Sequence, residues 1–386
     1  MTSPAEFSNI ARGRESGRFA AAYRVLEEAV AAGAFPGCAF GVLAGGEVVL
    51  KDGLGRFTYD PASPVVTADT VYDVASLTKV VATTAAAMLL VRRGQIDLDL
   101  PLGELLPGFV AGRAAADPAR RVTLKNLLAH NSGLPGYAEL FHTATTPAAL
   151  FQACLALPLE AEPGARAEYS DPGFILLGKA LEVKMREPLD SWVRREVFGP
   201  LGMEATGFCP APAQRKSIPP TEEDTWFRHR LIQGEVQDEN AWVLGGVAGN
   251  AGLFSNIADL LRFADAVINT NAGATNAGAN AGNVSGGGQY LFDGKVLKQF
   301  TQKQAPAGSS CALGWDTPSA NSSAGRHFSA NSIGHLAFSG CSLWIDFDAG
   351  VAIVLLTNRT WPDRKNQGIR EVRPAFHDAV REALQK

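Results

Sequence analysis

Strand-forming segments lie at the two ends of the chain, and this distribution restricts the fold more than any other feature of the sequence. Runs typical of strands occupy residues 38–43, 47–51, 313–316, 332–338, 342–347 and 351–356. Helical spacing of apolar residues dominates between them, at 78–93, 124–130, 146–156, 173–184, 189–197 and 258–268. Two more amphipathic helices are predicted near the ends, at 18–32 and 374–384.

The simplest fold for this order belongs to the α+β class. It has an antiparallel sheet flanked by helices, and the sheet domain is assembled from residues 1–78 and 289–386. A mostly helical domain, residues 79–270, is inserted between these two segments. Residues 271–288 consist almost entirely of Asn, Ala, Gly and Ser, which predicts a flexible low-complexity loop. We expect the functional site in a cleft between the sheet and the helical domain.

Composition argues against several classes of function. The net charge of -4 gives no electrostatic basis for binding nucleic acid or an anionic membrane. The five cysteines are scattered without a Cys-x-x-Cys pair, and the six histidines are dispersed, so we expect free thiols and neither a metal site nor a cofactor. The apolar run 80–91 is too short to span a bilayer. No signal peptide is visible, which predicts a cytoplasmic protein, or a periplasmic or secreted one if a leader has been removed.

Two motifs carry side chains suited to nucleophilic catalysis. Ser76 and Lys79 stand three positions apart at the start of a predicted helix, so they share one face and can form a hydrogen bond. The N-terminus of that helix also directs free N–H groups at developing negative charge. Tyr169 precedes another predicted helix, and a tyrosine beside a lysine can relay a proton. Taken separately, these residues also fit structural roles, with Lys79 on a solvated helix face and Asp171 as a helix N-cap.

A third motif is the glycine-bounded segment 334–340 (GHLAFSG), which opens a C-terminal strand. A strand beside a nucleophile can supply a backbone N–H group to an oxyanion. Taken alone, the segment also fits a plain strand.

Together the three motifs resemble those of serine β-lactamases and penicillin-binding proteins, in particular class C β-lactamases and family VIII carboxylesterases. Residues 72–79 (YDVASLTK) resemble the nucleophile motif of that family. Residues 169–171 (YSD) resemble its Tyr-x-Asn motif, and 335–337 (HLA) lie where its Lys-Thr-Gly or His-x-Gly triplet belongs. The resemblance extends from about residue 20 to the C-terminus, outside 271–288.

The resemblance implies the roles of individual residues. Ser76 would attack an ester, amide or lactam carbonyl to form an acyl-enzyme, which water then hydrolyses. Lys79 and Tyr169 would handle the proton, and the resemblance does not decide which of them is the base. The backbone N–H groups of Ser76 and Phe338 would form the oxyanion hole.

Four residues depart from the family pattern, and each change weakens recognition of an anionic, amide-bearing substrate. Asp171 replaces Asn, and a carboxylate accepts hydrogen bonds but cannot donate one; it also favours a charged Lys79. His335 replaces a permanent cation with a group that is mostly neutral at pH 7. Leu336 removes a hydroxyl group, and Ala337 adds a methyl group where the family keeps Gly. The sequence therefore predicts a serine hydrolase that prefers carboxylic esters.

Two alternatives remain open. Within the enzyme class, the chain could be a β-lactamase or a D-Ala-D-Ala carboxypeptidase. From another class, it could be a non-catalytic or slowly acylating penicillin-recognising sensor, although a pure binder has no need of Ser76, Lys79 and Tyr169 together. The expected partner is a small-molecule ester, lactam or peptide, and the oligomeric state is not predicted. The polar run 234–240 is interpreted as a solvated acidic loop.

Overall fold

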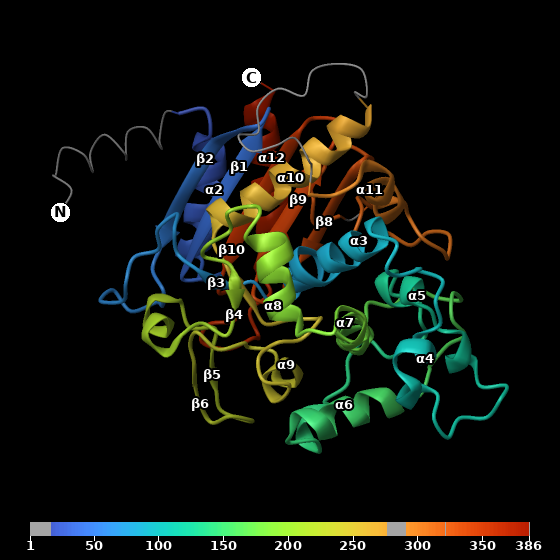
Figure 1. The fold of residues 1–386 in the computed structure, drawn as a ribbon. Coiled ribbons are helices and arrows are strands. Elements are labelled where there is room, and N and C mark those ends of the chain that lie inside the picture. Colours follow the sequence, from blue (N-terminus) through green and yellow to red (C-terminus); the bar gives the residue numbers. More distant parts are fainter. Residues whose placement is uncertain (1–16, 276–290, 321, 386) are drawn as a thin grey trace.

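The computed structural model describes residues 17–275, 291–320 and 322–385. Its centre is an antiparallel sheet with the strand order β2-β1-β10-β9-β8 (Figure 1). The strands are β1 (Gly37–Ala44), β2 (Glu47–Gly55), β8 (Ser332–Leu336), β9 (Ser342–Asp346) and β10 (Val351–Thr357). Strand β1 pairs with β10 from Cys38 opposite Thr357 to Ala44 opposite Val351, so the two ends of the chain meet in the middle of the sheet. The predicted α+β class is confirmed, as is an antiparallel sheet built from both ends of the chain.

Helices cover both faces of this sheet. Helices α2 (Ala20–Ala31) and α12 (Ile369–Leu384) pack together on one face, and α10 (Ile257–Thr275) lies on the other (Figure 1). Successive residues of β10 alternate between the two apolar cores, and all seven are buried. The run at 351–356 is therefore continuously hydrophobic because neither face of the strand meets water.

Most of the remaining helices lie between β2 and β8 in the chain. They are α3 (Ala85–Arg92), α4 (Leu102–Leu105), α5 (Leu124–Leu128), α6 (Pro147–Ala156), α7 (Asp171–Met185), α8 (Leu189–Val193), α9 (Glu239–Val243) and α11 (Gly294–Thr301). Short 3-10 turns cover Pro107–Phe109, Pro118–Arg121, Leu140–His142 and Pro212–Ser217. The strands here are short: β3 (Tyr72–Asp73), β7 (Leu253–Ser255) and β4 (Gly207–Phe208) form one small sheet, and β5 (Glu222–Asp224) pairs with β6 (Arg230–Ile232).

The predicted helix at 78–93 is less regular than its sequence indicates. It begins as a 3-10 turn, Ala75–Leu77, passes through a π-helical turn, Lys79–Thr84, and becomes α-helical only from Ala85. The stretch Ala75–Arg92 is long and apolar enough to cross a membrane, but 83% of it is buried inside the protein. It is therefore the central core helix, and π-helical turns of this kind occur frequently at functional sites.

Several expectations need correction. The predicted strand at 313–316 forms only isolated bridges, between Cys311 and Asp316 and between Asp316 and Gly334. Helix α10 extends to Thr275, so residues 271–275 are helical, and residues 276–288 of the predicted flexible loop lie outside the described residues. Helix α10, which lies mostly within the predicted helical insertion, packs against β1 and β10 of the sheet. The five cysteines are free thiols, as expected.

Candidate active site

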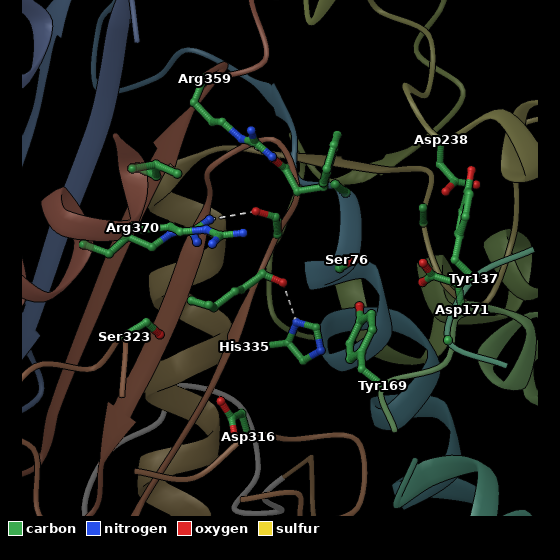
Figure 2. Close-up of a pocket in the computed structure, with 18 of the residues that line it drawn as sticks. Ser76, Tyr137, Tyr169, Asp171, Asp238, Asp316, Ser323, His335, Arg359 and Arg370 are labelled. Carbon is green, nitrogen blue, oxygen red and sulfur yellow. Dashed lines mark hydrogen bonds between the residues drawn. The ribbon is translucent and has the colours of Figure 1, made fainter. Parts of the chain in front are cut away.

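A cleft with a volume of about 1270 Å³ lies where the sheet meets the helical region. Its lining includes residues predicted from all three motifs: Ser76, Tyr169, Asp171, His335, Leu336, Ala337 and Phe338. Lys79 is completely buried beneath Ser76. The structure thus brings together every site residue that the sequence predicted, and Figure 2 shows Tyr169 and His335 beside Ser76.

A strained turn presents Ser76 to this cleft. Ala75, directly before the serine, has a φ of 42°, in the left-handed region that a residue with a side chain adopts only at a cost. Asp73 accepts the Ala75 N–H group at 2.8 Å, and the Thr78 hydroxyl donates to the Ala75 carbonyl at 2.5 Å. The second Asp73 oxygen accepts the N–H group of Gln237 at 2.8 Å. The side chains of Asp73 and Thr78 therefore hold the turn in place, and the backbone of Gln237 anchors Asp73.

Lys79 uses all three of its ammonium protons. Its Nζ atom donates to Ser76 Oγ at 3.2 Å, to Asp171 Oδ1 at 2.6 Å and to the Asn250 carbonyl at 3.0 Å. Burial alone lowers the pKa of Lys79, but the charge of Asp171, with a smaller contribution from Tyr169, outweighs burial and leaves the pKa above its ordinary value. Lys79 is therefore a cation at neutral pH, as the presence of Asp171 in the sequence predicts.

Tyr169 stands over this cation. The Lys79 Nζ atom lies 4.8 Å from the centre of its ring, and the His130 ring packs against the same ring at 4.6 Å. In Figure 2 its hydroxyl group points toward Ser76. Burial of the hydroxyl raises the pKa of Tyr169 to about 12, against the opposing effect of Lys79. Tyr169 is therefore a neutral phenol at pH 7, and its side chain is partly exposed at the cleft.

Helix α7 begins beside Tyr169 and supplies Asp171. Ser170, and not Asp171, is the N-cap: its hydroxyl group accepts the Gly173 N–H group at 3.1 Å and donates to the Pro135 carbonyl at 2.7 Å. The Ser170 N–H group donates to Nδ1 of His130 at 3.0 Å. Because Ser170 caps the helix, the carboxylate of Asp171 is free to pair with Lys79.

His335 is a neutral hydrogen-bond acceptor toward the cleft. Its Nδ1 atom lies 2.7 Å from the Leu336 carbonyl, which can only accept, so Nδ1 carries the proton and Nε2 is left with a lone pair. Burial, with a smaller effect from Lys79, lowers the pKa of His335 to about 3. The site therefore offers no cation at this position.

This neutral histidine should affect acid stability. In the unfolded chain a histidine has a pKa near about 6.5, so between that pH and about 3 the unfolded state takes up a proton that folded His335 does not. The corresponding stability is present above pH 6.5 and is lost as the pH falls. We expect the melting temperature of His335→Gln to fall less between about pH 7 and pH 4.5 than that of the wild type. Equal falls would contradict a neutral His335.

The run 234–240 is not the solvated loop that its sequence predicts. Gln237, Asp238 and Glu239 line the cleft, and Gln237 and Glu239 are buried. Glu239 and Glu222 both bind the guanidinium group of Arg364, whose single positive charge offsets part of the charge of the two buried carboxylates. Charge counts alone miss such pairings, because the cation lies 125 positions further along the chain than Glu239.

Acidic and basic side chains both line the cleft. Figure 2 shows Tyr137, Asp171 and Asp238 on one side of Ser76 and Arg359 and Arg370 on the other. Burial, followed by the charge of Asp171, raises the pKa of Asp238 to about 7. Among the described residues, no group of three or more His, Cys, Asp or Glu side chains is arranged to hold a metal ion.

Ser76 lies at the start of the buried core helix, with the Lys79 cation beneath it and Tyr169 above it, at the edge of the sheet. This arrangement is that of a serine hydrolase with a β-lactamase-like fold. The family described as "Beta-lactamase" matches residues 23–374 of this sequence. The chain belongs to the β-lactamase family.

Similar proteins carry several different names. Proteins of Salmonella typhi and Salmonella typhimurium named "Putative D-alanyl-D-alanine carboxypeptidase" are 30% identical, over 76% of this chain and 70% of theirs. The structure titled "EstCE1, a hydrolase with promiscuous acyltransferase activity" is 20% identical, with a TM-score of 0.73 over 94% of this chain and 98% of that one. Simvastatin synthase (LovD) from Aspergillus terreus is 19% identical, with a TM-score of 0.70 over 96% and 99%. The two structures support the fold alone.

Proposed function

We propose that this protein is a carboxylesterase that hydrolyses small esters through an acyl-enzyme on Ser76. Ser76 is the nucleophile, Lys79 stabilises negative charge, and Tyr169 transfers the proton. The N–H groups of Ser76 and Phe338 stabilise the oxyanion. The Phe338 N–H group makes no hydrogen bond to any other described residue, which leaves it available to a substrate.

The protonation states of Lys79 and Tyr169 determine the route of the proton. Lys79 is an ammonium ion with three acceptors, so it has no lone pair with which to act as the base. As Ser76 attacks the ester carbonyl, its proton passes to the oxygen of Tyr169, and the proton of Tyr169 passes to the departing alcohol oxygen. Water then attacks the acyl-enzyme by the reverse relay and releases the acid. Lys79 stays protonated and stabilises the negative charge on these oxygens.

The observation that carries the preference for esters is the contact between Asp171 and Lys79. At 2.6 Å from Nζ, the carboxylate holds the ammonium ion and has no proton to donate to a substrate carbonyl. An amide or lactam side chain loses a hydrogen bond there, whereas a simple ester requires none. His335, a neutral acceptor, adds no attraction for a substrate carboxylate.

A second candidate is an amide-bond hydrolase, either a D-Ala-D-Ala carboxypeptidase or a β-lactamase. The names of the Salmonella relatives, at 30% identity, favour it. The cleft is also large enough for such substrates, at about 1270 Å³.

Intact-protein mass spectrometry tests the proposed mechanism against a binding or sensor function. With p-nitrophenyl butyrate, we expect a transient butyryl adduct that is absent in Ser76→Ala and decays as the ester is consumed. A stable adduct would indicate an acylated sensor. No adduct, together with substrate binding but no turnover, would indicate a binder. Either outcome would contradict a hydrolase.

Asp171→Asn tests the proposed origin of the ester preference. The amide can donate a hydrogen bond to a substrate carbonyl, and loss of the anion lowers the pKa of Lys79. We expect kcat/KM for nitrocefin, relative to that for p-nitrophenyl butyrate, to rise about tenfold. Asp238→Asn is the matched control, because Asp238 lines the same cleft without binding Lys79. An unchanged ratio in Asp171→Asn would remove Asp171 from the explanation.

A further inference from the structure

Two buried arginines hold the turn that follows strand β8. This turn, residues 337–341, connects β8 to β9 and includes Phe338. Arg373 of α12 donates to the carbonyl oxygens of Ala337 at 2.7 Å, Gly340 at 3.0 Å and Cys341 at 3.0 Å. Arg359 donates from Nε to the Phe338 carbonyl at 2.7 Å. The guanidinium group of Arg359 also stacks 4.4 Å from the centre of the Phe338 ring.

Neither arginine is placed there by an opposite charge. Arg359 and Arg373 are 5% and 6% exposed, and within the described ranges neither has a carboxylate at ion-pair distance. Burial lowers the pKa of both to about 10, so both remain cations at neutral pH. Burying a cation without an anion is costly. The carbonyl groups of this turn compensate Arg373, whereas Arg359 is compensated by the carbonyl groups of Phe338, Arg364 and Asn366.

The geometry of the peptide bond links these contacts to the cleft. The Ala337 carbonyl and the Phe338 N–H group belong to one trans peptide unit, in which they point in opposite directions. Arg373 holds the carbonyl on the side of α12, so the N–H group is directed away from α12. Arg359 fixes the next carbonyl, that of Phe338, so the peptide units on both sides of Phe338 are held.

We propose that Arg373 is the positioning residue of the oxyanion hole, orienting the Phe338 N–H group toward Ser76 through its hydrogen bond to the Ala337 carbonyl, and that Arg359 supports it from the other side. This inference rests on the proposed function, in which that N–H group binds the oxyanion. Arg373 lines the cleft, but its side-chain hydrogen bonds go to the carbonyl groups of this turn and not to Ser76. Its positive charge behind the peptide unit also strengthens the N–H group as a donor.

The inference is tested with Arg373→Met, which keeps much of the side-chain volume and removes the donors. Arg381→Met is the matched control, because Arg381 is also buried on α12 but binds the His327 carbonyl and Asp346, outside this turn. For p-nitrophenyl butyrate we expect kcat to fall about 100-fold in Arg373→Met with KM nearly unchanged, as for loss of one oxyanion donor. The control should retain its activity.

The affinity for phenylboronic acid measures the oxyanion hole separately from the stability of the protein. The acid forms a tetrahedral adduct on a nucleophilic serine and so reports the oxyanion hole without turnover. In Arg373→Met we expect the affinity for phenylboronic acid to fall by the same factor as kcat. Adding guanidinium ions to this variant should restore part of both the affinity and kcat, and Arg373→Lys should show smaller losses of both than Arg373→Met. Unchanged boronate affinity, or an equal loss in Arg381→Met, would overturn the inference.

Failure of the proposed function gives a different result from failure of this inference. If the wild type hydrolyses no ester in a Ser76-dependent manner, the esterase assignment fails, while boronate binding still measures the oxyanion site. If Arg373→Met does not fold, as circular dichroism would show, the Arg373→Lys variant carries the test. Boronate affinity in that variant equal to the wild type, without any fall in kcat, would then count against positioning by the guanidinium group.

Discussion

Ser76→Ala is expected to reduce kcat/KM for p-nitrophenyl esters by about 10⁴-fold or more. The hydroxyl group is the only part of the motif that forms the covalent bond, and removal of a catalytic serine leaves only the contribution of the oxyanion hole and of substrate binding. Lys79 keeps its bonds to Asp171 and Asn250 in the variant. The melting temperature should therefore change little, and the loss can be measured by steady-state kinetics on folded protein.

Ser323→Ala is the matched control for this substitution. Ser323 lines the same cleft, and its buried hydroxyl group has no hydrogen-bond partner among the described residues. Its removal should leave ester turnover close to the wild-type rate. Residual activity in Ser76→Ala above a few per cent of the wild type would mean that another group performs the hydrolysis.

Tyr169→Phe is expected to lower kcat for the same esters by about 10²–10⁴-fold, the range typical of a lost proton-transfer group. The ring would keep its packing against His130 and Lys79, so folding and KM should change little. Because the phenol is neutral with a pKa of about 12, the loss should persist across the neutral pH range and should not be restored by raising the pH to 9. Stopped-flow measurement of the acylation step would locate the loss.

Tyr137→Phe provides the comparison for this second substitution. Tyr137 lines the cleft, but its hydroxyl group donates to Glu239 at 3.3 Å and not to Ser76. A small effect in Tyr137→Phe beside a large one in Tyr169→Phe supports a specific proton relay. Similar effects in both would indicate a general change in the polarity of the cleft.

The sheet and the long helices could be predicted because their patterns are strong and local. Strand β10 is a continuous apolar run buried on both faces, and α2 and α12 carry apolar residues at helical spacing. Strands β3 and β4 contain two residues each, too few to show any period. The π-helical turn after Ser76 was not predictable either, since it depends on packing and on the anchored turn at Ala75, not on helix propensity.

The reactive residues could be predicted from the sequence because they lie in the family motifs. The residues that hold them in position could not. Asn250 contributes only its backbone carbonyl to Lys79, which any residue type could supply. Arg373 lies 36 positions from Ala337, and an arginine on an amphipathic helix normally faces solvent. One signal for this turn did exist: Gly340 has a φ of 100°, and a Cβ atom there would lie 2.0 Å from Thr357 Oγ1. That glycine indicated a tightly held turn but not what holds it.

We expect Asp171 and His335 to make this serine hydrolase more active on esters than on lactams. The most direct test compares kcat/KM of the wild type for p-nitrophenyl acetate, p-nitrophenyl butyrate and nitrocefin, with Ser76→Ala as the blank. We expect ester turnover that disappears in Ser76→Ala, with little cleavage of nitrocefin. Dominant, Ser76-dependent cleavage of nitrocefin would contradict this expectation and would identify the protein as a β-lactamase.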